Sequence, residues 1–101
     1  MTNEQIDLEL FKVCFPNTNR VRIPRTFSFV DPVYGIINCF SVLIPEMNRR
    51  GFDFDVYVYV SGSGYAEFWK GYEKSSVDFH NRNELPAAIS KAAYAALKGE
   101  K

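Results

Sequence analysis

The chain has 101 residues, of which 47% are hydrophobic and 16% are aromatic. This length suits one domain with a single core, and the composition excludes a disordered chain, so we expect residues 1–101 to form a single domain. Twelve basic and twelve acidic residues cancel. Because phosphate neutralisation supplies much of the affinity of nucleic-acid-binding proteins, this balance argues against nucleic acid as the partner.

No segment predicts export or a membrane span. The first twelve residues, MTNEQIDLELFK, carry acidic residues where a secretory signal needs basic ones. The longest apolar segment, residues 33–44, is about half a membrane span. We therefore expect a cytoplasmic protein with no membrane contact, in which Cys14 and Cys39 are reduced and buried.

The N-terminal third predicts one helix and one irregular segment. Thr2 and Gln5 form a capping box, and apolar residues at helical spacing then predict a helix over 3–14. Residues 17–30 contain three arginines, Arg20, Arg22 and Arg25, and no acid. Pro24 restricts any strand there to a sheet edge, so we expect an extended, partly irregular segment.

A second helix is predicted over 32–44. Asp31-Pro32 is a strong helix start, and the apolar run that follows is typical of a buried helix. Pro45 has no N–H to donate, so the helix is expected to end or kink there. The sequence Arg49-Arg50-Gly51 is a suitable exit, with cations at the negative helix end and a glycine able to take positive φ.

A long β-hairpin, 52–60 and 65–72, is the clearest prediction. Residues 52–60 alternate with period two, and the block SGSG then joins strand to strand. A phosphate-binding glycine loop leads into a helix, so SGSG is interpreted as a turn with Gly62 and Gly64 at positive φ.

The length of that turn leaves the strand register open. A three-residue turn pairs Val58 with Ala66 and places Trp69 on the tyrosine face, whereas a four-residue turn pairs Val58 with Glu67 and places Trp69 on the valine face. We favour the first, because it keeps Glu67 out of the core.

Residues 75–80 are a possible third strand, and 85–98 predict an alanine-rich helix that can approach a sheet closely. The predicted fold class is therefore α+β: a small antiparallel sheet with three helices. Because Tyr57 and Tyr59 occupy the second face of the first strand, we expect helices on both faces of the sheet.

Three stretches carry a resemblance to a known family: PRTFSFVDPVYGIINCF, the hairpin GFDFDVYVYV…GYAEFW, and the C-terminal LPAAISKAAYAAL. Together with the order of the predicted elements, they resemble the small phage proteins that carry the phage ABA (alpha/beta/alpha) sandwich domain. The resemblance implies a phage or prophage origin, hence the cytoplasm of an infected bacterial host, and a sandwich fold. It implies no assigned activity.

The sequence offers no catalytic or metal-binding constellation. His80 is the only histidine, which excludes histidine-pair metal sites, and Ser63 lacks the strand-to-helix context of a nucleophile elbow. Asp53 and Asp55 share a strand face but are interpreted as solvated. We expect a protein that is not an enzyme and that has no cofactor.

Binding is the favoured class of function. The candidate contact residues are three arginines beside phenylalanines and a set of amphipathic aromatics: Arg20, Arg22, Arg25, Tyr57, Tyr59, Tyr65 and Trp69. The first hypothesis is a phage accessory protein of the anti-defence type that binds a host protein or complex. The alternatives are a sponge for a nucleotide-like small molecule and a virion or assembly component; a homodimer suits each of them.

Overall fold

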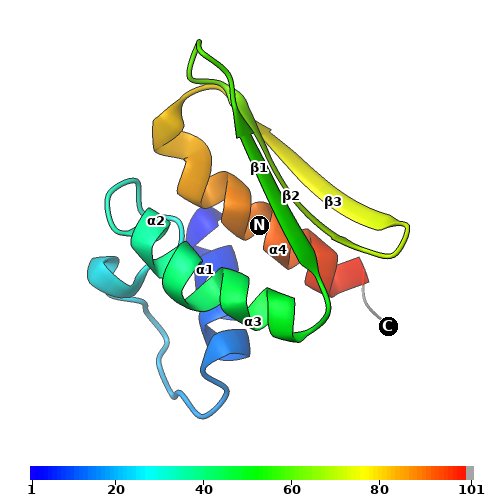
Figure 1. The fold of residues 1–101 in the computed structure, drawn as a ribbon. Helices are drawn as coiled ribbons and strands as arrows, with labels where there is room; N and C mark the ends of the chain where they lie inside the picture. Colours follow the sequence, from blue (N-terminus) through cyan, green and yellow to red (C-terminus); the bar gives the residue numbers. More distant parts are fainter. Residues whose placement is uncertain (100–101) are drawn as a thin grey trace.

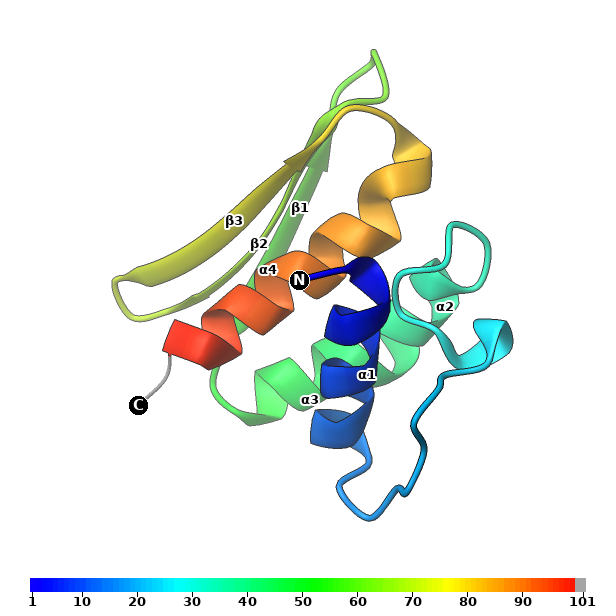
Figure 2. The same cartoon turned by 180° about the vertical axis from the view of Figure 1, so that it is seen from behind.

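The computed structural model describes residues 1–99, which contain three helices and one antiparallel sheet (Figures 1 and 2). The first helix is α1 (Asn3–Cys14), the second is a continuous run of α2 (Gly35–Asn38), the π-helical turn η2 (Cys39–Leu43) and α3 (Ile44–Arg49), and the third is α4 (Leu85–Gly99). The strands are β1 (Asp53–Val58), β2 (Gly64–Lys70) and β3 (Glu73–Phe79), with short 3-10 turns η1 (Arg25–Phe27) and η3 (Arg82–Glu84). The predicted α+β class is confirmed.

Helix α1 begins where the sequence predicts. The Thr2 hydroxyl accepts a hydrogen bond from the Gln5 backbone N–H at 3.2 Å, and the Gln5 side chain accepts one from the Thr2 N–H at 2.8 Å. These two bonds satisfy helix N–H groups that have no partner inside the helix.

The second helix does not end at Pro45, so the predicted boundary of 32–44 is wrong at both ends. It begins at Gly35, after Asp31 has accepted hydrogen bonds from the N–H groups of Val33 and Tyr34 at 2.9 Å each. The turn before Pro45 widens to π geometry, in which the Ile44 N–H donates to the Cys39 carbonyl. A wider turn makes room for a proline ring and tolerates its missing donor, so the helix continues to Arg49.

This helix is only half buried, which corrects the expectation of a buried helix. Its inner side carries Cys39, Leu43 and Met47, each with no exposed surface. Its outer side leaves Ile37 68% and Phe40 48% exposed. The helix lies beside β1, where Phe40 meets Phe54 edge-on at 6.0 Å between ring centroids. It therefore buries one face rather than its whole circumference.

The hairpin register differs from both predicted alternatives. Val58 pairs with Gly64, and Val56 pairs with Ala66. The turn has three residues, 60–62, because the Tyr59 N–H donates to the Ser63 carbonyl at 2.7 Å and the Gly62 N–H donates to the Tyr59 carbonyl at 2.9 Å. The predicted pairing of Val58 with Ala66 requires a turn at 61–63, one residue too far along the chain, and this shifts the strand register by two residues. The error moves the register by an even number, so Trp69 still lies on the tyrosine face, opposite Asp53.

The two glycines of SGSG have different reasons for being glycine. Gly62 has φ +94°, a backbone conformation that favours glycine at the end of a three-residue hairpin turn. Gly64 has an ordinary φ, so the expected positive φ is wrong there. A Cβ atom at Gly64 would lie 1.8 Å from the Tyr57 carbonyl oxygen. Gly64 is therefore required by the close approach of two strands.

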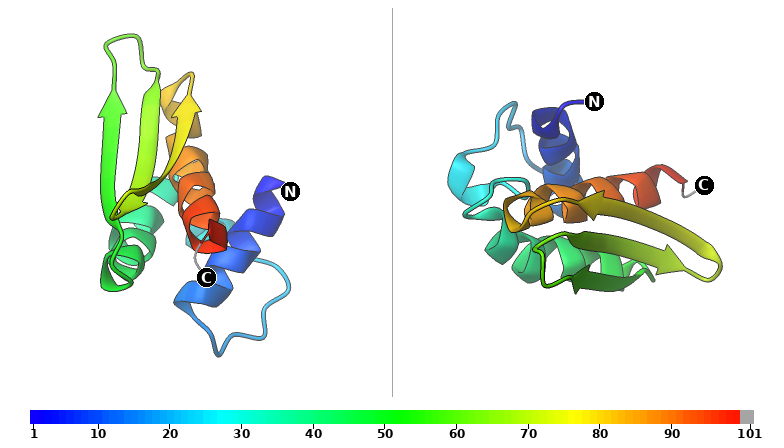
Figure 3. Two further views of the ribbon diagram at one scale, coloured as in Figure 1. Left: turned by 90° about the vertical axis from the view of Figure 1, so that its right-hand side faces the viewer. Right: turned by 90° about the horizontal axis from the view of Figure 1, so that it is seen from above.

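The helices lie on one face of the sheet, and the predicted covering of both faces is wrong (Figure 3). Helix α4 packs against β2 and β3, α3 reaches β1, and α1 packs against α4 on the side away from the sheet. The alanine-rich prediction for α4 is confirmed: Ala88, Ala92, Ala93 and Ala96 are buried. Ala66, Phe68 and Phe79 of the sheet are buried in the same core cluster. The molecule therefore has three layers: the sheet, then α4 and the second helix, and then α1.

The segment between α1 and the second helix is irregular, as predicted, and is fixed at its C-terminal end. The buried Asp7 side chain accepts hydrogen bonds from the Ser28 hydroxyl at 2.6 Å and from the Phe29 N–H at 2.8 Å. The Phe29 carbonyl accepts from the buried Ser90 hydroxyl of α4 at 3.0 Å. Because these groups lie away from solvent, their hydrogen bonds hold residues 28 and 29 in place between α1 and α4.

Candidate binding surface on the sheet

The uncovered side of the sheet, which we call the open sheet face, is built by the residues that alternate with the core residues of the strands. Three residues lie in each row across β1, β2 and β3. The rows are Asp53–Trp69–Lys74, Asp55–Glu67–Ser76 and Tyr57–Tyr65–Asp78, with Tyr59 beyond the last row.

Three of the predicted tyrosines come together at one end of this face. The rings of Tyr57 and Tyr65 are stacked, with centroids 6.1 Å apart and planes 12° from parallel. The ring of Tyr59 lies 4.8 Å from that of Tyr57. Tyr57 is 52% exposed although it packs against both rings. Stacked, accessible tyrosines lose little side-chain entropy when a partner covers them.

Trp69 lies on the same face, but the row of Asp55 and Glu67 separates it from the tyrosines. The prediction that Trp69 lies on the tyrosine face is thus confirmed. Trp69 and the tyrosines nevertheless lie two rows apart and form separate aromatic groups. Together they border an acidic strip. Tyrosine and tryptophan are both enriched in protein-contact surfaces.

The charge of the open sheet face is negative. Four carboxylates, those of Asp53, Asp55, Glu67 and Asp78, lie there with one ammonium group, that of Lys74. Lys74 Nζ lies 3.6 Å from Glu67 Oε2 and partly neutralises it. The pKa of Tyr65 is raised, mainly by desolvation and to a smaller extent by the negative charges of Asp55 and Glu67. A basic partner is electrostatically suited to such a face.

The three arginines that the sequence singled out do not converge. Arg25 Nε donates to Asp31 Oδ1 at 2.7 Å, and its guanidinium lies 5.4 Å from the Tyr34 ring centroid. Arg22 lines a cavity of about 240 Å³ that also includes Glu4. Arg20 lies over Phe27, 5.8 Å from its ring centroid. Each cation therefore has its own surroundings.

The structure offers little for nucleophilic or metal chemistry. Cys39 is buried as expected, whereas Cys14 is only half-buried. Burial raises the pKa of Cys39 to about 12, and partial burial together with the Glu46 carboxylate raises the pKa of Cys14 to about 12. Both thiols are thus protonated at neutral pH and are weak nucleophiles. Within residues 1–99, no group of three or more histidine, cysteine or acidic side chains is placed to hold a metal ion.

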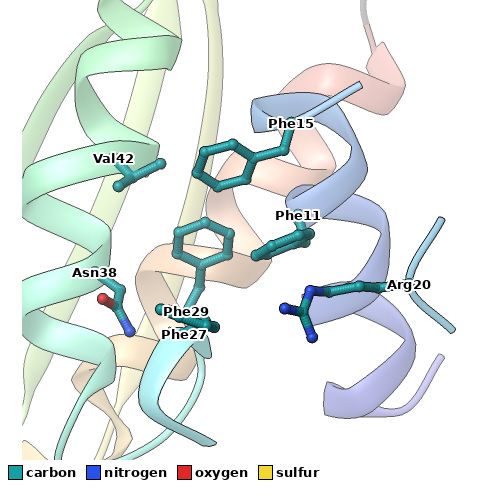
Figure 4. Close-up of a pocket in the computed structure, with 7 residues that line it drawn as sticks. All are labelled: Phe11, Phe15, Arg20, Phe27, Phe29, Asn38 and Val42. Atoms are coloured by element: carbon teal, nitrogen blue, oxygen red, sulfur yellow. The ribbon is translucent and has the colours of Figure 1, made fainter. Parts of the chain in front are cut away.

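Sequence reasoning missed an apolar cavity between α1, residues 20–29 and the second helix. Its lining comprises Phe11, Phe15, Arg20, Phe27, Phe29, Asn38 and Val42 (Figure 4). The only signal in the sequence was the mixture of arginines and phenylalanines in residues 20–29. The contributions of Phe15 and Asn38 depend on how separate helices pack.

No helix within residues 1–99 is long and apolar enough to cross a membrane. No protein-family model matches the chain, and neither the curated proteins nor the solved structures contain a significant match. The resemblance to the phage ABA sandwich domain therefore stays a prediction, and the open sheet face is the surface from which a function is argued.

Proposed function

We propose that this protein is a small, non-catalytic accessory protein of phage or prophage origin that binds a host protein in the bacterial cytoplasm. The observation that carries the binding proposal is the open sheet face, on which stacked tyrosines and Trp69 border four carboxylates. The phage origin comes from the family resemblance alone. The anti-defence role is a hypothesis built on that origin, since the resemblance implies no assigned activity.

The chemistry of this face favours a partner with a basic surface. Aromatic residues supply most of the binding energy in typical protein interfaces, whereas complementary charge mainly sets the partner and the association rate. An acidic strip between tyrosines and a tryptophan would attract arginine side chains, which can pair with carboxylates and stack on rings. Association should therefore weaken as the salt concentration rises.

The test is affinity capture from a bacterial host lysate, followed by a binding titration with the captured partner. Trp69→Ala and Tyr57→Ala should each weaken binding by about tenfold or more, because both remove aromatic contact area. Asp55→Lys should slow association and reduce its salt dependence.

The matched control is Tyr72→Ala. Tyr72 lies between β2 and β3 and is fully exposed, so this variant removes an exposed tyrosine that does not belong to the open sheet face. It should bind like the unaltered protein. The proposal is wrong if a captured partner binds all four variants equally, or if its contact surface is acidic.

Self-association is a second candidate function, and it corresponds to the assembly-component hypothesis. Ile37 and Phe40 are 68% and 48% exposed and are spaced to share one side of the second helix, and Val33, in the turn before that helix, is 61% exposed. Exposed apolar patches of this kind often mark protein contacts. The nucleotide-sponge alternative has no comparable observation, since its three arginines have separate neighbours.

A further inference from the structure

The apolar cavity beside Arg20 has the size and lining of a small-molecule site. It measures about 300 Å³, at the lower end of the range for ligand pockets. Phe11 and Phe29 form buried walls, whereas Phe15 and Phe27 are 43% and 50% exposed and leave it accessible. Figure 4 shows rings from α1 and from residues 27–29 surrounding one space, with Val42 and Asn38 on the opposite side.

Arg20 makes the cavity attractive to an anion. No carboxylate lines this cavity or the adjoining one, of about 420 Å³, that shares Phe11, Phe15 and Arg20 with it. Among residues 1–99, the Arg20 guanidinium makes no ion pair, and its contact is the Phe27 ring. A guanidinium group that has no counterion can bind a carboxylate with two parallel hydrogen bonds.

The walls of the cavity are held in place by groups from all three helices. Asn38 Nδ2 donates to the carbonyls of Thr26 and Ser28, at 2.9 Å each. Asp7 holds the Phe29 N–H, and Ser90 holds the Phe29 carbonyl. Because these bonds fix residues 26–29 without a ligand, little ordering cost is left for binding.

We infer that this cavity binds a small aromatic monocarboxylate, with its ring among the phenylalanines and its carboxylate on the Arg20 guanidinium. The four phenylalanines of the lining favour a flat ring, because aromatic pairs gain from stacked or edge-on contact. Apart from Arg20 and Asn38, whose amide nitrogen already donates to two backbone carbonyls, the lining is apolar, so a second charge or a sugar would lose more hydrogen bonds to water than the cavity replaces. This site is independent of the open sheet face, and either assignment can fail alone.

The test uses 2-naphthoate as the probe, with isothermal titration calorimetry and amide chemical shifts as readouts. We expect a dissociation constant of about 1 mM or lower and shift changes confined to the cavity residues. The neutral 2-naphthamide should bind at least about fivefold more weakly, since it retains the ring but loses the charge. Adenosine monophosphate should bind more weakly than 2-naphthoate.

Two neighbouring arginines provide the matched variants. Arg20→Gln should weaken 2-naphthoate binding by about fivefold or more, whereas Arg22→Gln should change it less than about twofold, because Arg22 lines a different cavity. Phe27→Ala should also weaken binding, and because Phe27 is half exposed this variant should keep its fold.

Several outcomes would overturn the inference. These are the absence of shift changes at the cavity residues, equal binding of the acid and the amide, equal effects of the two arginine variants, or tighter binding of adenosine monophosphate. In the last case the ligand class is a nucleotide instead. Circular dichroism of each variant verifies that the fold is retained.

Discussion

Replacing Asp7 should separate two effects of one buried carboxylate. The side chain is 5% exposed, and its two oxygens accept the hydrogen bonds from Ser28 and Phe29. Asp7→Ala removes both bonds and leaves two buried donors without a partner. Each bond to a charged acceptor is worth about 1.5–3 kcal/mol, and removing the buried charge offsets part of that sum. We therefore expect the free energy of unfolding to fall by about 2–4 kcal/mol.

The same carboxylate should make stability depend on pH. Desolvation raises the pKa of Asp7 above its usual value of 3.8; the hydrogen bonds from Ser28 and Phe29 oppose this only in part. As the pH rises from about 4, the unfolded chain loses this proton before the folded chain does. The folded state then binds more protons, so the Asp7 contribution to stability falls with rising pH and levels off above the folded pKa.

The measurement is urea unfolding of the unaltered protein and of Asp7→Asn between about pH 4 and pH 7. Asparagine keeps the shape but cannot ionise, and its amide oxygen can still accept the hydrogen bond from the Phe29 N–H. The unaltered protein should lose stability relative to Asp7→Asn as the pH rises. A difference that stays constant, or that changes in the opposite direction, would refute this account of the buried carboxylate. So would an Asp7→Ala variant as stable as the original.

Two further predictions concern the hairpin and the second helix. Gly64→Ala should destabilise the protein by about 1–3 kcal/mol or more in urea unfolding, because the new Cβ would overlap the Tyr57 carbonyl oxygen. The control is Gly99→Ala, whose Cβ would meet nothing within 4 Å and which should be nearly neutral. Ile37→Glu should shift any dimer towards monomer in light scattering over a wide concentration range, because it places a charge in the exposed apolar patch; a dimer unaffected by this change would remove the patch from the interface.

Local patterns in the sequence determined most of the secondary structure. The capping box of Thr2 and Gln5, the alternation of residues 52–60 and the alanines of α4 act within a few residues of each other. Because such signals depend on near neighbours, they predict elements well. The predicted end of the second helix at Pro45 was wrong, because the π-helical turn that accommodates this proline is a backbone adjustment that no sequence pattern indicates.

The sites depended on tertiary structure to different degrees. The choice of a three-residue turn, which keeps Glu67 out of the core, placed Trp69 on the face of Tyr57 even though the register was wrong, since a shift of two residues preserves the face. The uncovered state of that face could not be predicted, because it depends on which side of the sheet the helices occupy. Sequence alone interpreted the tyrosines as evidence of a covering helix, whereas they cover one another.

The sequence by itself determined that this chain forms a small α+β protein with a tyrosine-bearing hairpin and an alanine-rich last helix. The tertiary structure decided that the sheet keeps one face open, that the three arginines separate, and that Phe11, Phe15, Arg20, Phe27 and Phe29 surround one cavity. The physical reason is range: hydrogen bonding and hydrophobic periodicity act along a few residues of chain. A surface or a cavity exists only after segments distant in sequence have packed together.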